Sequence, residues 1–223
     1  MKKILLLLAA LTFSFASYSQ VKIGLRVAPG LSLNSVSDKI GTDSLVFSKN
    51  GGGMSFSGGV NLDFFFSDNY ALMTGLWYTS KSAKLKVVDS TDPSDIATTT
   101  QSVSLQYVQL PVALKVYTNE LATNMKLFFT LGGTVDVKIA EKLKKTNDPF
   151  YAALYQHAYM PLNVGILVGT GTEYQTGGNI ILFGGIYYNR GLLGQFKNTD
   201  LFKYKDNAKY GISSLNLEIG AKF

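Results

Sequence analysis

The final stretch of the chain, residues 215–223, alternates strictly between apolar and polar side chains. Successive side chains of a β-strand point to opposite faces, so this pattern predicts a two-faced strand. One face would carry Leu215, Leu217, Ile219, Ala221 and Phe223, and the other Asn216, Glu218, Gly220 and Lys222. A polar face with two opposite charges behind an apolar face suits a strand with lipid outside and a polar barrel interior inside.

Seven earlier segments alternate in the same way. They lie near residues 21–33, 53–66, 70–81, 107–116, 125–139, 162–174 and 180–189. Strands of about ten residues are long enough to cross a bilayer at a tilt. Pro111 falls inside one of them and removes a ladder hydrogen bond, so we expect a bulge or local bend there. The sequence therefore predicts an all-β fold, namely an eight-stranded antiparallel up-and-down transmembrane β-barrel.

The connections between these segments alternate in length. The short ones are residues 67–69, 118–124 and 175–178, and the long ones are 34–52, 83–100, 141–159 and 193–210. Outer-membrane barrels have short periplasmic turns and long external loops. The apolar faces also gather aromatic residues near both ends of the strands, as interfacial girdles do. We therefore expect four external loops, and we expect both ends of the mature chain on the periplasmic side.

The N-terminus has the features of a secretory signal peptide. Lys2 and Lys3 precede an apolar run, and small residues follow it, which predicts removal of residues 1–19 and a mature barrel domain over residues 20–223 that begins at Gln20. The apolar run is shorter than the roughly 20 residues of a membrane-spanning helix, which disfavours an uncleaved anchor. Outer-membrane localisation after export follows as an expectation.

Composition narrows the possible partners. The sequence holds no Cys, which excludes a lipidated N-terminal Cys and disulfide bonds. Removing Lys2 and Lys3 lowers the formal charge from +6 to +4, and this excess is spread along the chain. It forms no basic stripe, so nucleic acid is not an expected partner. Outer-membrane lipid is one, and an envelope or extracellular protein is another.

Many charged residues fall on the predicted inner faces. They are Lys22, Arg26, Asp63, Lys115, Lys126, Asp136, Lys138, Glu173, Glu218 and Lys222. An eight-stranded barrel has room for side chains and little water, so these charges must pair. We expect a lumen charge network in which Lys126 and Lys222 meet acids such as Glu173 and Glu218 near the periplasmic end. A narrow ion path and a small-ligand site are the alternatives.

The sequence contains no recognisable set of catalytic residues. The one histidine, His157, has no visible catalytic partner, and no serine stands at nucleophile-elbow spacing. With no Cys and no second His, neither a metal site nor any other cofactor is expected. The loop around His157 is unusually aromatic, with Phe150, Tyr151, Leu154 and Tyr155. It either covers the barrel mouth, sits among lipopolysaccharide headgroups, or forms a partner-binding surface.

Four segments carry a resemblance to a known family. They are residues 21–26, 71–81, 107–115 and 219–223, of which Tyr107–Lys115 is the most specific. The chain resembles the PorT-like outer-membrane β-barrel family of Bacteroidetes over nearly its whole mature length. It departs at Gln109, where the family often has an acid, and at Tyr187, where an Arg is frequent. The resemblance implies an eight-stranded barrel but little about activity, although PorT itself is tied to protein secretion.

The sequence therefore predicts an integral outer-membrane β-barrel protein that is not an enzyme. Its lumen would be filled by polar side chains, and its external loops would contact a partner or the cell surface layer. Two alternatives remain, a narrow outer-membrane channel and a soluble periplasmic barrel that binds lipid inside. The charged inner faces argue against the second, because a lipid cavity should be apolar.

Overall fold

The computed structural model describes residues 20–36, 45–49, 52–89, 97–145, 160–193 and 210–223. Within these ranges the chain forms nine strands and no helix long and apolar enough to cross a membrane. The strands are β1 (Gln20–Val36), β2 (Leu45–Lys49), β3 (Gly52–Ser67), β4 (Tyr70–Asp89), β5 (Ala97–Tyr117), β6 (Met125–Lys145), β7 (Leu162–Gln175), β8 (Ile181–Gly191) and β9 (Tyr210–Lys222).

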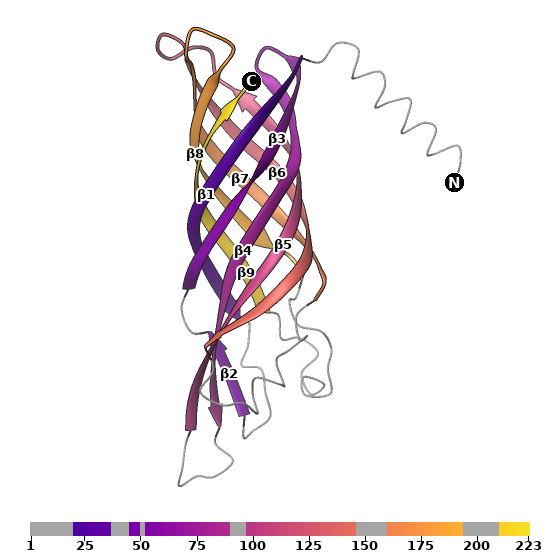
Figure 1. Ribbon diagram of the computed structural model, residues 1–223, viewed down its shortest axis with the longest axis vertical. Coiled ribbons are helices and arrows are strands. Elements are labelled where there is room, and N and C mark those ends of the chain that lie inside the picture. The colour runs from indigo at the N-terminus through magenta and orange to yellow at the C-terminus, as the bar shows by residue number, and fades with distance from the viewer. Residues whose placement is uncertain (1–19, 37–44, 50–51, 90–96, 146–159, 194–209) are drawn as a thin grey trace, which may run out of the picture.

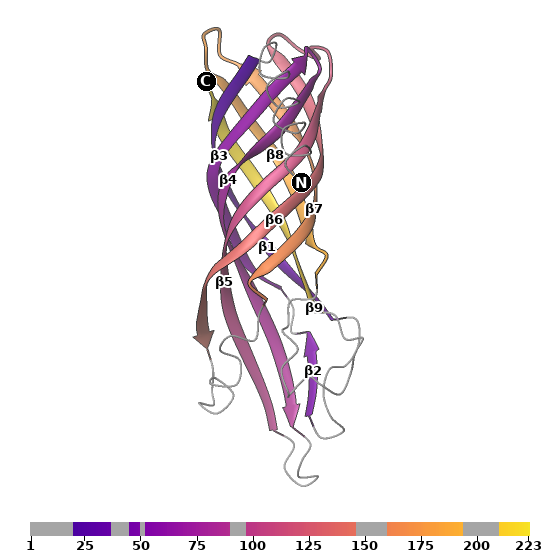
Figure 2. The ribbon, with the colours of Figure 1, turned by 90° about the vertical axis from the view of Figure 1, so that its right-hand side faces the viewer.

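Eight of these strands close into the predicted barrel. The sheet runs in the order β2-β4-β3-β1-β9-β8-β7-β6-β5, and a further pairing of β4 with β5 completes the ring. Every pairing is antiparallel, and the strands tilt steeply around the barrel axis (Figures 1 and 2). The chain closes on itself where β1 pairs with β9, with Val27 opposite Ile219. Closure leaves no exposed barrel edge, which is what a sheet needs in lipid.

The two faces of the sheet are sorted as the alternation predicts. Apolar side chains cover the outside, including Leu25, Leu131 and Leu217, and polar or charged ones such as Asn61 and Lys115 are buried inside. The short turns and Phe223 lie together at one end of the barrel, shown at the top of Figure 1. Because short turns mark the periplasmic side of outer-membrane barrels, we refer to this as the short-turn end.

The opposite end differs from the prediction. The predicted loop 34–52 contains β2, which pairs with the outer part of β4 from Leu45–Asp89 to Lys49–Leu85. The predicted loop 83–100 is largely strand, because β4 continues to Asp89 and β5 begins at Ala97. These segments are rich in Val and Thr, whose branched side chains favour extended backbone. As a result β2, β4 and β5 extend beyond the rest of the barrel (Figure 2).

Pro111 does not create the predicted bulge. The register of β4 against β5 is the same on both sides of it, from Thr74–Val112 to Trp77–Gln109. Pro111 lacks a backbone N–H, so the ladder hydrogen bond opposite Gly75 is lost, but the register does not shift. The Thr74 hydroxyl donates to the Pro111 carbonyl oxygen at 2.9 Å. Register shifts occur elsewhere in β5, where it pairs with β6 around Gln106 and Ser102.

Candidate functional site

Charged side chains meet inside the barrel at three levels. The level nearest the short-turn end, called here the vestibule cluster, consists of Asp63, Lys115, Tyr117, Glu173 and Lys222. The middle level is the Arg26–Glu218 pair. The outer cluster, nearest the long loops, consists of Lys81, Gln109, Asp136, Asn163 and Asn189. The vestibule cluster and the Arg26–Glu218 pair join strands that are distant in sequence, whereas the outer cluster spans the consecutive strands β4 to β8.

The vestibule cluster joins β3, β5, β7 and β9. The Lys222 ammonium group contacts carboxylate oxygens of both Asp63 and Glu173. The Lys115 ammonium nitrogen lies 3.3 Å from Asp63 Oδ2 and 3.5 Å from Glu173 Oε1. The Tyr117 hydroxyl donates to Glu173 Oε1 at 3.0 Å. Two cations therefore face two anions, and the balance allows all four to be buried.

Aromatic rings surround the amines of the vestibule cluster. The Lys115 ammonium nitrogen lies 4.3 Å from the centroid of the Phe128 ring, and that of Lys222 lies 5.3 Å from the centroid of Phe183. Ring faces attract cations and exclude water from them. The cluster is thereby held in an apolar cage that closes the barrel beneath it.

The middle level fills the waist of the barrel. Arg26 Nε lies 2.8 Å from Glu218 Oε2, and the guanidinium carbon lies 3.7 Å from the centroid of the Trp77 ring. Trp77 in turn donates its indole N–H to Asn61 Oδ1 at 2.6 Å. The centroid of the Tyr187 ring lies 5.6 Å from the same guanidinium carbon of Arg26. The Trp77 and Tyr187 rings and the paired arginine thus fill this section with side chains.

A glycine makes room for the Tyr187 ring. A Cβ atom at Gly169, on the neighbouring strand β7, would lie 2.4 Å from a ring carbon of Tyr187, well inside contact distance. The ring thus lies flat over the bare backbone of β7, and its hydroxyl is 3.3 Å from that of Thr130. The glycine at this position is what lets a large ring cross an eight-stranded lumen.

The outer cluster is organised around Asp136. Gln109 Nε2 donates to Asp136 Oδ1 at 2.7 Å, and Asn163 Nδ2 donates to Oδ2 at 3.1 Å. The Lys81 ammonium nitrogen lies 3.5 Å from Asp136 Oδ2 and donates to Asn189 Oδ1 at 2.8 Å. The single carboxylate is therefore compensated by one lysine and two amides, and with Asn189 the cluster ties together five strands, β4 to β8, near the outer end.

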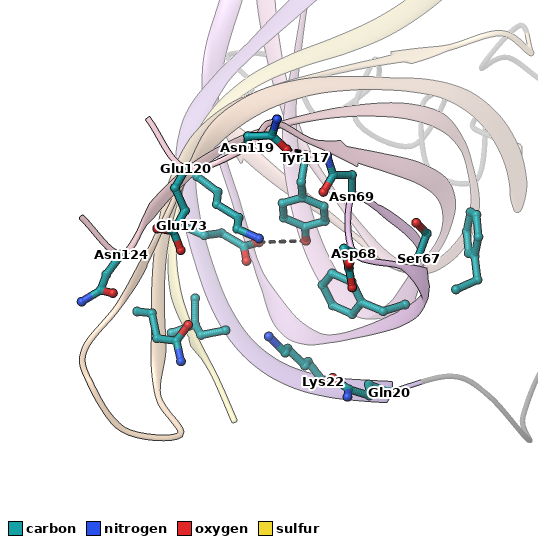
Figure 3. A pocket seen from close by; sticks show the side chains of 15 residues that line it. Gln20, Lys22, Ser67, Asp68, Asn69, Tyr117, Asn119, Glu120, Asn124 and Glu173 are labelled. Carbon is teal, nitrogen blue, oxygen red and sulfur yellow. Dashed lines mark hydrogen bonds between the residues drawn. The ribbon is translucent and has the colours of Figure 1, made fainter. Parts of the chain in front are cut away.

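A cavity of about 710 Å³ opens at the short-turn end, above the vestibule cluster (Figure 3). Glu173 and Tyr117 form part of its floor, and Lys22 and Lys126 line its walls. Asp68 and Glu120 reach it from the short turns. We call this cavity the vestibule. Its lining is mostly polar, so it suits a water-soluble ligand better than a lipid chain.

The structure distributes the charged residues singled out from sequence over several sites. Lys115, Glu173, Lys222 and Asp63 meet in the vestibule cluster, whereas Glu218 pairs with Arg26 instead of with a lysine. Asp136 lies in the outer cluster, Lys126 and Lys22 line the vestibule, and Lys138 lies 2.8 Å from Glu141 in β6. The loop residues Phe150, Tyr151, Leu154, Tyr155 and His157 lie outside the described residues.

Sequence reasoning missed several members of the three levels. Lys81 was left out, although continuing the alternation one step beyond Thr79 places it on the inner face. Tyr117 likewise lies one step beyond Lys115. Asn163 and Asn189 fall on predicted inner faces but carry no charge, and Gln109 stands out in the sequence only as a departure from the family pattern. Within the part of the chain that the structure describes, no group of three or more His, Cys, Asp or Glu side chains is placed to hold a metal ion.

A family model and several solved structures are similar to this chain. Residues 15–197 match the family model described as outer membrane protein beta-barrel domain. OprG from Pseudomonas aeruginosa superposes with a TM-score of 0.50 at 12% identity, covering 92% of this chain and 97% of that one. Neisserial surface protein A gives 0.47 at 14% identity, covering 92% and 99%. The Escherichia coli outer membrane protease OmpT gives 0.42 at 11%, covering 91% and 96%. A search of curated proteins gives no match.

Proposed function

The chain belongs to the outer membrane protein beta-barrel domain family, and on that basis we propose that it is a non-enzymatic outer-membrane protein with a closed lumen. Its external loops contact a partner or the cell surface layer. Residues 1–19 are removed on export, so the mature chain begins at Gln20. The observation that carries the proposal is the filling of the barrel by three charge-balanced levels, which makes the interior a structural core.

The filled waist favours a sealed barrel over the narrow channel. Arg26 is held between the Trp77 ring and Glu218, and Tyr187 covers the adjoining wall. An ion crossing this level would have to displace a paired arginine and two rings. The sidedness of the sheet also disfavours the soluble lipid carrier, because apolar side chains cover the outside while charges fill the inside.

We expect the protein to fractionate with the outer membrane and to show a heat-dependent electrophoretic shift. A closed barrel resists unfolding by detergent until it is boiled, because its strands are hydrogen-bonded all the way round. The same purified protein should give no conductance steps in planar bilayers, with a general porin as the positive control. A soluble periplasmic band without a shift would point to the lipid carrier, and discrete conductance steps would point to the channel.

The loop that contains Phe150, Tyr151 and Tyr155 is proposed as the partner-contacting segment. Exposed aromatic side chains often dominate binding energy at interfaces. Replacing all three with Ala should abolish recovery of a cross-linked partner from intact cells. The heat-dependent shift should remain, since the sequence pattern places these residues in a loop between two predicted strands. Leu121→Ala in a short turn is the control. Equal recovery from the triple variant and the control would eliminate this role for the loop.

We also propose that the chain belongs with the PorT-like proteins, supported by the segment Tyr107–Lys115. Its two departures from that pattern fit the local contacts. Gln109 donates to Asp136, whereas an acid there would repel it. Tyr187 lies beside Arg26, where an Arg would place two like charges together. Each departure thus preserves charge balance inside this barrel.

A further inference from the structure

The lysines around the vestibule outnumber the carboxylates at the same depth. Lys115 and Lys222 are balanced by Asp63 and Glu173 in the vestibule cluster. Lys22 and Lys126 line the cavity as well. In the described part of the chain, no carboxylate oxygen lies within 4.0 Å of either ammonium group. Lys22 and Lys126 lie across their strand pairs from Asp63 and Glu173, and these two carboxylates are already engaged by Lys115 and Lys222. The inner part of the vestibule therefore holds two ammonium groups without an ion pair of their own.

These two lysines belong to opposite walls of the cavity. Lys22 lies on β1 and Lys126 on β6, and these strands are opposite in the ring of eight. The Lys22 ammonium nitrogen is held 5.1 Å from the centroid of the Phe65 ring and points into the vestibule (Figure 3). A ligand in the cavity would therefore lie between two cationic walls.

The charges at the rim have the opposite sign. Asp68 belongs to the turn between β3 and β4, and Glu120 to the turn between β5 and β6. Side-chain amides complete the lining and supply both donors and acceptors: Gln20, Asn69, Asn119, Asn124 and Gln175. The proposed cleavage before Gln20 adds an α-amino group at one of these lining residues. Among the lining residues, the two lysines and Glu173 thus lie on barrel strands, and the other two acidic side chains lie in the turns.

The vestibule ends blindly at its floor. Glu173 and Tyr117 are hydrogen-bonded to each other there, and the aromatic cage around Lys115 lies beneath. A solute that enters must leave by the same opening, so the cavity is arranged for binding and not for passage. Its volume of about 710 Å³ is well above what a single inorganic phosphate fills and lies within the range of small-molecule sites.

We propose that the vestibule binds an anionic ligand with carboxylate or phosphate groups, held between Lys22 and Lys126. The polar remainder of the ligand meets the side-chain amides. That the ligand comes from the periplasmic side rests on the proposed function. The two available sources are a free anion of the periplasm and the headgroup of an anionic lipid in the inner leaflet.

The test uses the mature protein in nonionic detergent micelles, titrated calorimetrically with citrate and with inorganic phosphate. Lys22→Gln/Lys126→Gln should weaken binding about tenfold or more, because hydrogen bonds to charged groups are lost. Asp68→Asn/Glu120→Gln should strengthen it severalfold, since like-charge repulsion at the rim is removed. Lys142→Gln, an exposed lysine at the other end of β6, is the matched control and should change nothing.

A second arm identifies the source. The protein is placed in nanodiscs with or without phosphatidylglycerol, and acetylation of Lys22 and Lys126 by a water-soluble reagent is measured by mass spectrometry. If citrate protects the two lysines from acetylation in lipid without phosphatidylglycerol, the ligand is a free anion. If only phosphatidylglycerol protects them, the ligand is a lipid headgroup. Absence of protection in every condition, or binding equally weakened by Lys142→Gln, overturns the proposal. If the ligand proposal fails in this way but the heat-dependent electrophoretic shift is retained, the proposed sealed barrel is unaffected.

Discussion

Asp63→Ala is expected to lower the free energy of unfolding by about 3–5 kcal/mol, the loss typical of breaking a buried ion pair from one side. Asp63 is fully buried and contacts both Lys115 and Lys222. Its removal leaves two buried ammonium groups with one carboxylate, Glu173. Urea titration of the protein folded in phospholipid vesicles measures the change.

Two further variants separate charge imbalance from a simple loss of packing. Asp63→Leu/Lys115→Met removes one anion and one cation together, so it should recover most of the stability lost in Asp63→Ala. Glu141→Ala breaks the partly exposed Lys138–Glu141 pair and should cost less than about 1 kcal/mol. If Asp63→Ala costs no more than Glu141→Ala, the vestibule cluster does not stabilise the barrel through charge balance.

Leu131→Arg is expected to cost about 2–4 kcal/mol in the same vesicles, the range for a cation on the lipid face near the bilayer midplane. The Leu131 side chain is 65% exposed and lies within the outward-facing apolar stretch of β6 from Phe129 to Ile139, with Leu114 and Val168 as its cross-strand neighbours. In lipid an arginine there must deform the bilayer or reach for the interface. In water the same substitution would be almost neutral.

Leu121 provides the matched comparison. It is 61% exposed, but it lies in the short turn between β5 and β6. Leu121→Arg should change the stability by no more than about 0.5 kcal/mol, as most surface substitutions do. Equal effects of the two arginine variants would mean that the apolar band around Leu131 does not lie in the hydrocarbon.

The sequence predicted most of the barrel because strand alternation is local. Each pair of neighbouring residues, such as Glu218 and Leu217, reports which side of the sheet it faces without reference to any other strand. The prediction failed where the signal was weaker. The sequence pattern predicts a loop where the short strand β2 forms, and the predicted inner face of β4 stops at Thr79, one step short of Lys81. Pro111 predicts a bulge or local bend, and the register shows that no bulge forms there.

The ion-pair partner of each charged residue inside the lumen could not be derived from the sequence in the same way. Glu218 and Glu173 both lie on inner faces, yet one pairs with Arg26 and the other with Lys115 and Lys222. Which charges meet depends on the depth that each strand reaches in the barrel. That depth is fixed by the stagger of eight strands around the ring, and no single segment carries this information.

The sequence by itself therefore determined which side chains face outward and which face inward, because the two-residue alternation of a strand can be read from neighbouring residues alone. Only the tertiary structure decided the three levels of charge, the blind vestibule and the opposition of Lys22 and Lys126. Those two lysines lie on strands four places apart in the closed ring. Closure and stagger bring them to the same depth, because the pairing of β1 with β9 and of β4 with β5 joins segments that are remote in the chain.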